Sequence, residues 1–100
     1  MPLSKAQRRH LKQLAHPLKP VVMIGQHGLT DAVLAETEQA LEAHELIKVR
    51  VSVGDRDARS AVIDELERRS GAERVQTIGH IAILYRAPGN RPPRITLPKG

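Results

Sequence analysis

Residues 47–53 alternate strictly between apolar and polar side chains, and this pattern constrains the fold more than any other in the sequence. Successive side chains of a β-strand point to opposite faces of the sheet, so the pattern predicts a strand over residues 46–53. The apolar side comprises Ile47, Val49, Val51 and Val53. The other side carries Lys48, Arg50 and Ser52. Such a strand needs a covering layer on one face and leaves a basic face in solvent.

Two helices are predicted before this strand. Ser4 and Gln7 form a capping-box pattern around the start of residues 5–15, which contain no glycine or proline. Thr30 is the expected N-cap of a second helix that ends near residue 44. We expect the acidic side chains of this second segment to lie in solvent; they are Glu36, Glu38, Glu42 and Glu45.

A third helix is predicted after the strand. Asp57 is its expected N-cap, and Gly71 follows its last residue, Ser70, in the place where a left-handed glycine commonly ends a helix. Beyond residue 86 the chain is basic and rich in proline, which predicts an extended tail over residues 87–100 whose segment 95–97 could add a short edge pairing.

Three more strands complete the pattern. Residues 21–24 form a continuous apolar run, which is typical of an interior strand. Residues 75–78 and 81–86 flank Gly79 and His80, a hairpin signal. The order is therefore a helix followed by βαβαββ. It predicts a two-layer α/β domain over residues 1–86, with a small mixed four-stranded sheet covered by helices on one face.

Charge is distributed unevenly along the chain. The net charge is +5, yet every acidic residue lies between Asp31 and Glu73. Residues 1–30 and 74–100 are purely basic, and such asymmetry indicates a polyanionic partner. The absence of cysteine, of a leader segment and of any run near the roughly 20 apolar residues that cross a bilayer predicts a cytoplasmic protein without a membrane partner.

Gly25-Gln26-His27-Gly28 lies between a predicted strand and a predicted helix. Glycines let a sugar-phosphate backbone approach closely, and the N–H groups at a helix start suit phosphate. From the pattern alone, a tight turn that needs a positive φ is the favoured explanation of the same two glycines.

A cationic stripe is predicted on the first helix. Its members recur at i, i+3, i+4 and i+7, and Lys19 follows them in the connector; they are Lys5, Arg8, Arg9 and Lys12. With no acid among them, they favour nucleic acid over the simpler interpretation of a solvated helix face.

Other chemistries find little support. The histidines, His10, His16, His27, His44 and His80, show no metal-ligand spacing, and no serine or carboxylate pair has a catalytic context, so we expect no metal, no cofactor and no enzymatic activity. Tyr85 is the only aromatic residue, which argues against recognition by base stacking. Structured RNA, held by its backbone, fits best.

Three separated segments resemble the bacterial YhbY proteins, the stand-alone form of the CRM (chloroplast RNA splicing and ribosome maturation) domain. They are HPLKPVVMIGQHGLT at 16–30, HELIKV at 44–49 and IGHIAILYR at 78–86. The resemblance implies a fold similar to the C-terminal domain of translation initiation factor three and an RNA-contacting GxxG loop reminiscent of KH domains. It also implies association with precursors of the large ribosomal subunit. Many relatives carry a basic residue in the loop, where this chain has Gln26 and His27.

The sequence thus predicts a monomeric, non-enzymatic RNA-binding protein of ribosome biogenesis without a small-molecule substrate. Its expected RNA-binding residues are Lys5, Arg8, Arg9, Lys12, Lys19, Gly25, Gln26, His27, Gly28, Lys48, Arg50 and Arg86. The alternative is a module that docks on a ribosomal protein or assembly factor through its acidic helix, residues 31–45.

Overall fold

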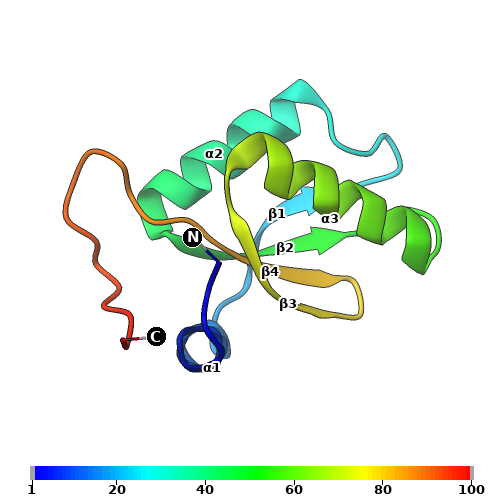
Figure 1. The fold of residues 1–100 in the computed structure, drawn as a ribbon. Helices are drawn as coiled ribbons and strands as arrows, with labels where there is room; N and C mark the ends of the chain where they lie inside the picture. The colour runs from blue at the N-terminus through cyan, green and yellow to red at the C-terminus, as the bar shows by residue number, and fades with distance from the viewer. Residues whose placement is uncertain (1, 100) are drawn as a thin grey trace.

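The computed structural model describes residues 2–99, within which three helices and four strands follow in the predicted order (Figure 1). The helices are α1 (Lys5–Ala15), α2 (Asp31–His44) and α3 (Arg56–Ser70). The strands are β1 (Pro20–Ile24), β2 (Leu46–Val51), β3 (Glu73–Ile78) and β4 (Ile81–Tyr85). The α/β class and the helix-βαβαββ order are confirmed.

The four strands form one mixed sheet in the order β1-β2-β4-β3. β1 runs parallel to β2, whereas β4 is antiparallel to both β2 and β3. The register places Ile24 beside Val51, and Arg50 beside Ile81. The strand ends near these pairs lie beside the glycine loop (residues 25–28) and the β3–β4 turn, and we call this end of the sheet the loop end. We call the opposite ends of the strands the tail end.

The helices do not all lie on one face, which corrects the predicted two-layer arrangement. α2 and α3 cover one face of the sheet, and α1 lies across the other (Figure 1). The reason is a second apolar surface on β2 and β4, formed by Leu46, Ile83 and Tyr85, which Leu11 and Ala15 of α1 cover. The larger core, around Val49 and Leu84, lies under α2 and α3.

β1 is an edge strand, so its predicted interior position is wrong. Val22 and Ile24 are buried against the larger core, but Val21 and Met23 point to the opposite face and are exposed. α1 packs on β2, β3 and β4 and leaves this part of the sheet uncovered. The exposed fraction of Met23 reaches 67%.

The helix caps follow the sequence signals with one shift. Ser4 and Gln7 form the complete capping box, and the Thr30 side chain accepts from the Val33 N–H. The N-cap of α3 is Asp55 instead of Asp57. Gly54, three residues after the end of β2, adopts a positive φ of 43°, and the helix begins two residues earlier than predicted.

The acidic face of α2 is only partly in solvent, and Glu45 is completely buried. Its carboxylate accepts from the Arg91 side chain at 2.7 Å and from the N–H groups of Arg94 and Ile95 at 2.9 and 3.2 Å. Burial alone would raise the pKa of Glu45, but these hydrogen bonds outweigh it and hold the pKa below its ordinary value. The prediction that Glu45 lies in solvent is therefore wrong.

The tail crosses the tail end of the sheet without regular secondary structure up to residue 99. The predicted edge pairing of residues 95–97 does not form. Ile95 and Leu97 instead pack against the core beneath α1, and the Gln7 side chain donates to the Pro98 carbonyl at 3.0 Å. Together with the buried Glu45 carboxylate, these contacts hold the tail on the domain.

Candidate nucleic-acid interface

The glycine loop, residues 25–28, forms a closed turn at the loop end of the sheet. The Gly28 N–H donates to the Gly25 carbonyl at 2.9 Å, and Gly28 has a φ of +70°. A Cβ at either glycine would meet nothing within 4 Å, so the need for glycine at position 28 comes from the backbone conformation and not from crowding. Gln26 and His27 project from the turn as exposed side chains.

Backbone donors at the start of α2 follow this turn closely in the chain, since α2 begins at Asp31. The first N–H groups of a helix have no hydrogen-bond partner within the helix. In α2 the Val33 N–H donates to the side-chain oxygen of Thr30 at 3.1 Å. For Asp31 and Ala32, residues 2–99 provide no acceptor. The Asp31 carboxylate is also here and pairs with Arg69 at 3.2 Å, which offsets part of its negative charge.

Hydrogen bonds fix the loop to the neighbouring strand ends. The Ser52 N–H donates to the Ile24 carbonyl at 2.8 Å, and Gln26 Nε2 reaches the Ser52 carbonyl at 3.4 Å. The Val51 N–H in turn donates to the His80 carbonyl at 2.6 Å. The loop is therefore held in a defined position against the end of β2, which in turn is bonded to the β3–β4 turn.

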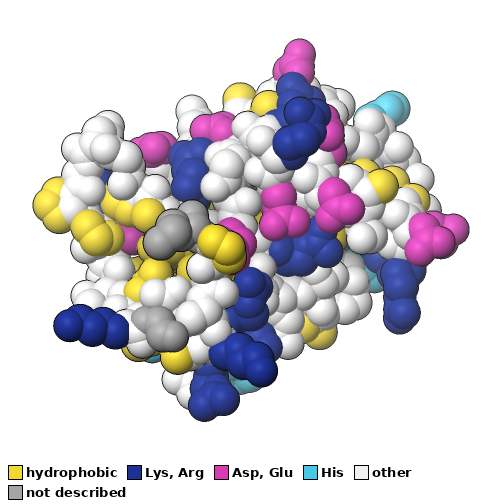
Figure 2. Space-filling view, in the orientation of Figure 1, with side chains coloured by type: hydrophobic (Ala, Val, Ile, Leu, Met, Phe, Trp, Pro, Cys, Tyr) yellow, Lys and Arg dark blue, Asp and Glu magenta, His cyan; other side chains and the backbone are white. Residues whose placement is uncertain are grey.

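Five of the predicted cations have exposed side chains and no carboxylate partner within the described part of the chain. We call them the cationic face: Lys5, Arg9, Lys12, Lys19 and Arg50. Figure 2 shows dark-blue side chains gathered over α1, at the bottom of the view.

Arg50 connects this face to the loop end, since its neighbours in the sheet are Met23 and Ile81. Lys19 does not make that connection. It precedes β1, so the five residues of that strand, about 16 Å at 3.3 Å each, separate it from the glycine loop.

The remaining three predicted cations make intramolecular contacts. Arg8 pairs with Glu73 at 3.0 Å and donates to the carbonyl oxygens of Arg74 and Val75 on β3. Lys48, half-buried beneath the end of α1, donates to the carbonyls of His16 and Leu18 at 3.3 and 3.0 Å. The expected open basic face of β2 is thus reduced to Arg50.

Arg86 lies at the tail end of the sheet, apart from the glycine loop. It pairs with Glu38 at 2.8 Å and Glu42 at 3.2 Å, and donates to the Ser70 carbonyl at 2.8 Å. Its side chain is only 19% exposed. These bonds join α2 to the end of α3, which is a structural role.

Sequence reasoning missed two cations at the loop end. Arg56 and Arg59 lie on the first turns of α3, beside the β3–β4 turn. They lie in the segment between Asp31 and Glu73 that holds every acidic residue, so the charge distribution does not distinguish them. Their spacing of i, i+3 directly after the Gly54-Asp55 turn was a signal that could have placed them together on one helix face.

Within the described residues, neither a metal site nor a membrane-spanning helix is found. Between residues 2 and 99 no group of three or more His, Cys, Asp or Glu side chains could hold a metal ion. None of the helices described has the length and apolar character to cross a membrane. Tyr85 is buried, so its ring does not offer a base-stacking platform. Burial together with the charge of Glu45 also raises the pKa of Tyr85.

The chain is similar to known proteins over most of its length. A protein of Haemophilus influenzae named RNA-binding protein is 55% identical over 84 residues, which are 84% of this chain and 85% of the relative. A probable RNA-binding protein of Pseudomonas aeruginosa is 46% identical over 86% of this chain and 83% of its own length. The solution structure of a hypothetical protein from Staphylococcus aureus superposes with a TM-score of 0.81 at 33% identity, covering 97% of this chain and all of the other.

The sequence pattern shared by a whole family supports the same relationship. The CRS1 / YhbY (CRM) domain matches residues 3–86, from the residue before the α1 capping box to the residue after β4. The match includes the glycine loop, all three helices and the complete sheet. The chain belongs to the CRS1/YhbY (CRM) domain family.

Proposed function

We propose that this protein binds structured RNA through the glycine loop and the cationic face, and that it acts as a non-enzymatic partner of large-ribosomal-subunit precursors. The observation that carries the proposal is the position of the loop: it is exposed, fixed by hydrogen bonds, and backed by the N–H groups of Asp31 and Ala32. The RNA-binding names of the close relatives support the same partner.

In this mechanism the loop positions one phosphate and the cationic face holds its neighbours. Glycines remove side chains from the contact, so that the RNA backbone can approach the amides at the start of α2. Arg50 then extends the contact toward α1. Contacts to about five phosphates would give a slope of log K against log salt near −3.5, at about 0.7 per contact.

The protein-docking alternative has less support. It requires a free acidic surface on α2, but Glu38, Glu42 and Glu45 hold Arg86 and Arg91 of the same chain. The RNA-binding names of the relatives support a binding role over an enzymatic role on RNA.

A matched pair of loop variants tests the proposal. Asn and Asp have similar shape and tolerate the left-handed conformation, so Gly28→Asn and Gly28→Asp differ mainly by one negative charge. Binding of a fluorescent ribosomal RNA hairpin, measured by anisotropy, should weaken far more in G28D than in G28N. Equal affinities for G28D, G28N and the wild type would exclude the loop from RNA contact.

The ribosomal part of the proposal has its own test. The tagged protein should sediment with particles lighter than the mature large subunit in a sucrose gradient, and crosslinked RNA should map mainly to large-subunit ribosomal RNA. G28D should leave the particle fractions while G28N stays. Crosslinks spread over messenger RNA would contradict the ribosomal assignment.

A further inference from the structure

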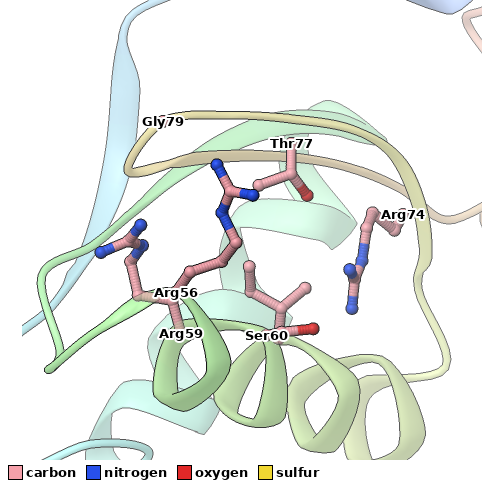
Figure 3. Close-up of a pocket in the computed structure, with 7 residues that line it drawn as sticks. Arg56, Arg59, Ser60, Arg74, Thr77 and Gly79 are labelled. Carbon is pink, nitrogen blue, oxygen red and sulfur yellow. The ribbon is translucent and has the colours of Figure 1, made fainter.

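A basic cavity opens at the loop end, between α3 and the β3–β4 turn. It has a volume of about 300 Å³. Its polar lining consists of Arg56, Arg59 and Ser60 from α3, and Arg74, Thr77 and Gly79 from the β3–β4 hairpin (Figure 3). The two α3 arginine side chains diverge, one rising toward the hairpin and the other extending toward the end of β2, whereas Arg74 extends from β3 toward α3.

The charges in this cavity are not balanced. Arg74 pairs with Asp64 and with Glu67, the latter at 3.1 Å, so its charge in the cavity lining is neutralised. Arg56 and Arg59 have no carboxylate partner in the described chain; the one bond found for Arg59 is a weak donation to the Gly54 carbonyl at 3.4 Å. Two guanidinium groups therefore face the same space without a counter-charge.

The nearest acidic side chains do not fill this role. Asp55 is committed as the N-cap of α3 and accepts from the Ala58 N–H at 2.9 Å. Arg56, Arg59 and Ser60 share one helix face at i, i+3 and i+4, and Asp57 lies about 100° around the helix from Arg56. Asp57 is not part of the cavity lining.

The donor set matches a phosphate group. Guanidinium groups bind phosphate oxygens in a bidentate manner, and the hydroxyls of Ser60 and Thr77 add donors on either side. Gly79, with a φ of +56°, leaves open space where a side chain would stand. A tetrahedral anion can therefore reach both arginines from the solvent.

The cavity and the glycine loop lie at the same end of the sheet. The order β1-β2-β4-β3 separates β1 from the hairpin strands by two to three inter-strand steps, or about 10–15 Å. A few nucleotides cover this distance. One RNA strand could contact the loop, pass the β2–α3 turn and reach Arg56 and Arg59.

We propose that this cavity, the arginine pocket, binds a phosphodiester group of the same RNA that contacts the glycine loop. Arg56 and Arg59 are its principal ligands, with Ser60 and Thr77 as accessory donors. This inference rests on the proposed RNA-binding function, but it assigns residues outside the cationic face.

Charge-matched double variants of the full chain provide the test. Arg56→Gln with Arg59→Gln removes both pocket cations. Arg68→Gln with Arg94→Gln removes the same charge from two exposed positions outside the proposed RNA contact, one paired with Glu65 and one at the tail end. With the hairpin RNA, the pocket variant should bind about tenfold or more weaker near 0.1 M salt, with a slope shallower by about 0.7 for the one phosphate lost, and the control should match the wild type. Equal behaviour of the two double variants would overturn the pocket while leaving a G28D defect, and hence the proposed function, intact.

NMR titration identifies the kind of phosphate. The amide signals of Ser60, Thr77 and Gly79 should shift saturably with a short single-stranded oligoribonucleotide, and only at far higher concentration with inorganic phosphate. Loss of these shifts in the R56Q/R59Q variant supports the assignment. Tighter binding of inorganic phosphate than of the oligonucleotide would assign the pocket to a free phosphate and overturn the RNA proposal, as would the absence of any shift.

Discussion

The arginines at the two ends of the sheet have opposite surroundings. At the tail end, Arg86 pairs with Glu38 and Glu42 of α2. Arg91 pairs with Glu45, the residue that follows α2. At the loop end, Arg50, Arg56 and Arg59 have no carboxylate partner among residues 2–99. The net charge of a segment therefore says little about which of its charges can bind an anion. Arg86 and Arg91 at the tail end hold the fold together, whereas Arg50, Arg56 and Arg59 at the loop end remain free for a ligand.

The largest expected effect is a loss of folding stability on removal of the Glu45 charge at the tail end. Glu45→Gln keeps the shape of the side chain but removes the charge that Arg91 and two backbone N–H groups share. We expect a loss of about 2–3 kcal/mol in the free energy of unfolding, measured in urea. Glu36→Gln, an exposed position on the same helix, serves as the control and should change stability by less than about 0.5 kcal/mol. Equal stabilities of the two variants would contradict the structural role of Glu45.

A second pair of variants separates structural from ligand-binding arginines. Arg86→Met should lower the free energy of unfolding by about 1–2 kcal/mol, because Glu38, Glu42 and the Ser70 carbonyl lose their donor. Arg9→Met should change it by less than about 0.5 kcal/mol, since Arg9 is exposed. RNA affinity should show the reverse order. A loss of affinity in R86M that exceeds that of R9M, while R86M remains folded, would contradict the comparison.

The cationic face should determine the salt dependence of RNA binding. Arg9→Gln with Lys12→Gln removes two proposed phosphate contacts, and the slope of log K against log salt should become shallower by about 1.4. Arg91→Gln with Arg94→Gln removes the same charge from the tail end. At a temperature at which circular dichroism shows it folded, this control should keep the wild-type slope, and a parallel reduction would show that the tail also binds RNA.

The smallest expected effect is a pH dependence at the tail end. The folded-state pKa of Glu45 lies below its ordinary value of 4.5, so in acid the folded state binds fewer protons than the unfolded state. Its stabilising contribution is complete above about pH 4.5 and is lost as the pH falls through the folded-state pKa. The difference in unfolding free energy between the wild type and E45Q should therefore shrink on acidification. A constant difference down to about pH 3 would contradict the assignment.

Local patterns predicted the elements of this fold, but not how the layers are arranged. Capping signals at Ser4 and Thr30 and the hairpin at Gly79 depend on residues close in sequence, and each is present in the structure. The position of α1 depends on a second apolar surface of the sheet, formed by residues far apart in the chain. No periodicity within α1 could have identified which face it covers.

The candidate site shows the same limit. The glycine loop was predicted from its own four residues and lies where a strand meets a helix. Among the predicted cations, exposure could not be separated from internal pairing, because the partners of Arg8 and Arg86 are 65 and 48 positions away in the chain. Arg56 and Arg59 were missed because the strand that completes their pocket is distant in sequence.

The buried Glu45 carboxylate also bears on where the folding unit ends. The family match stops at residue 86, but the donors that satisfy this carboxylate come from Arg91, Arg94 and Ile95. A protein truncated at residue 86 would keep every helix and strand and yet leave the Glu45 carboxylate without these three donors. We therefore expect the smallest independently stable unit to be longer than the segment by which the family is recognised, and expression of this domain should retain the chain through at least Leu97, whose side chain packs against the core beneath α1.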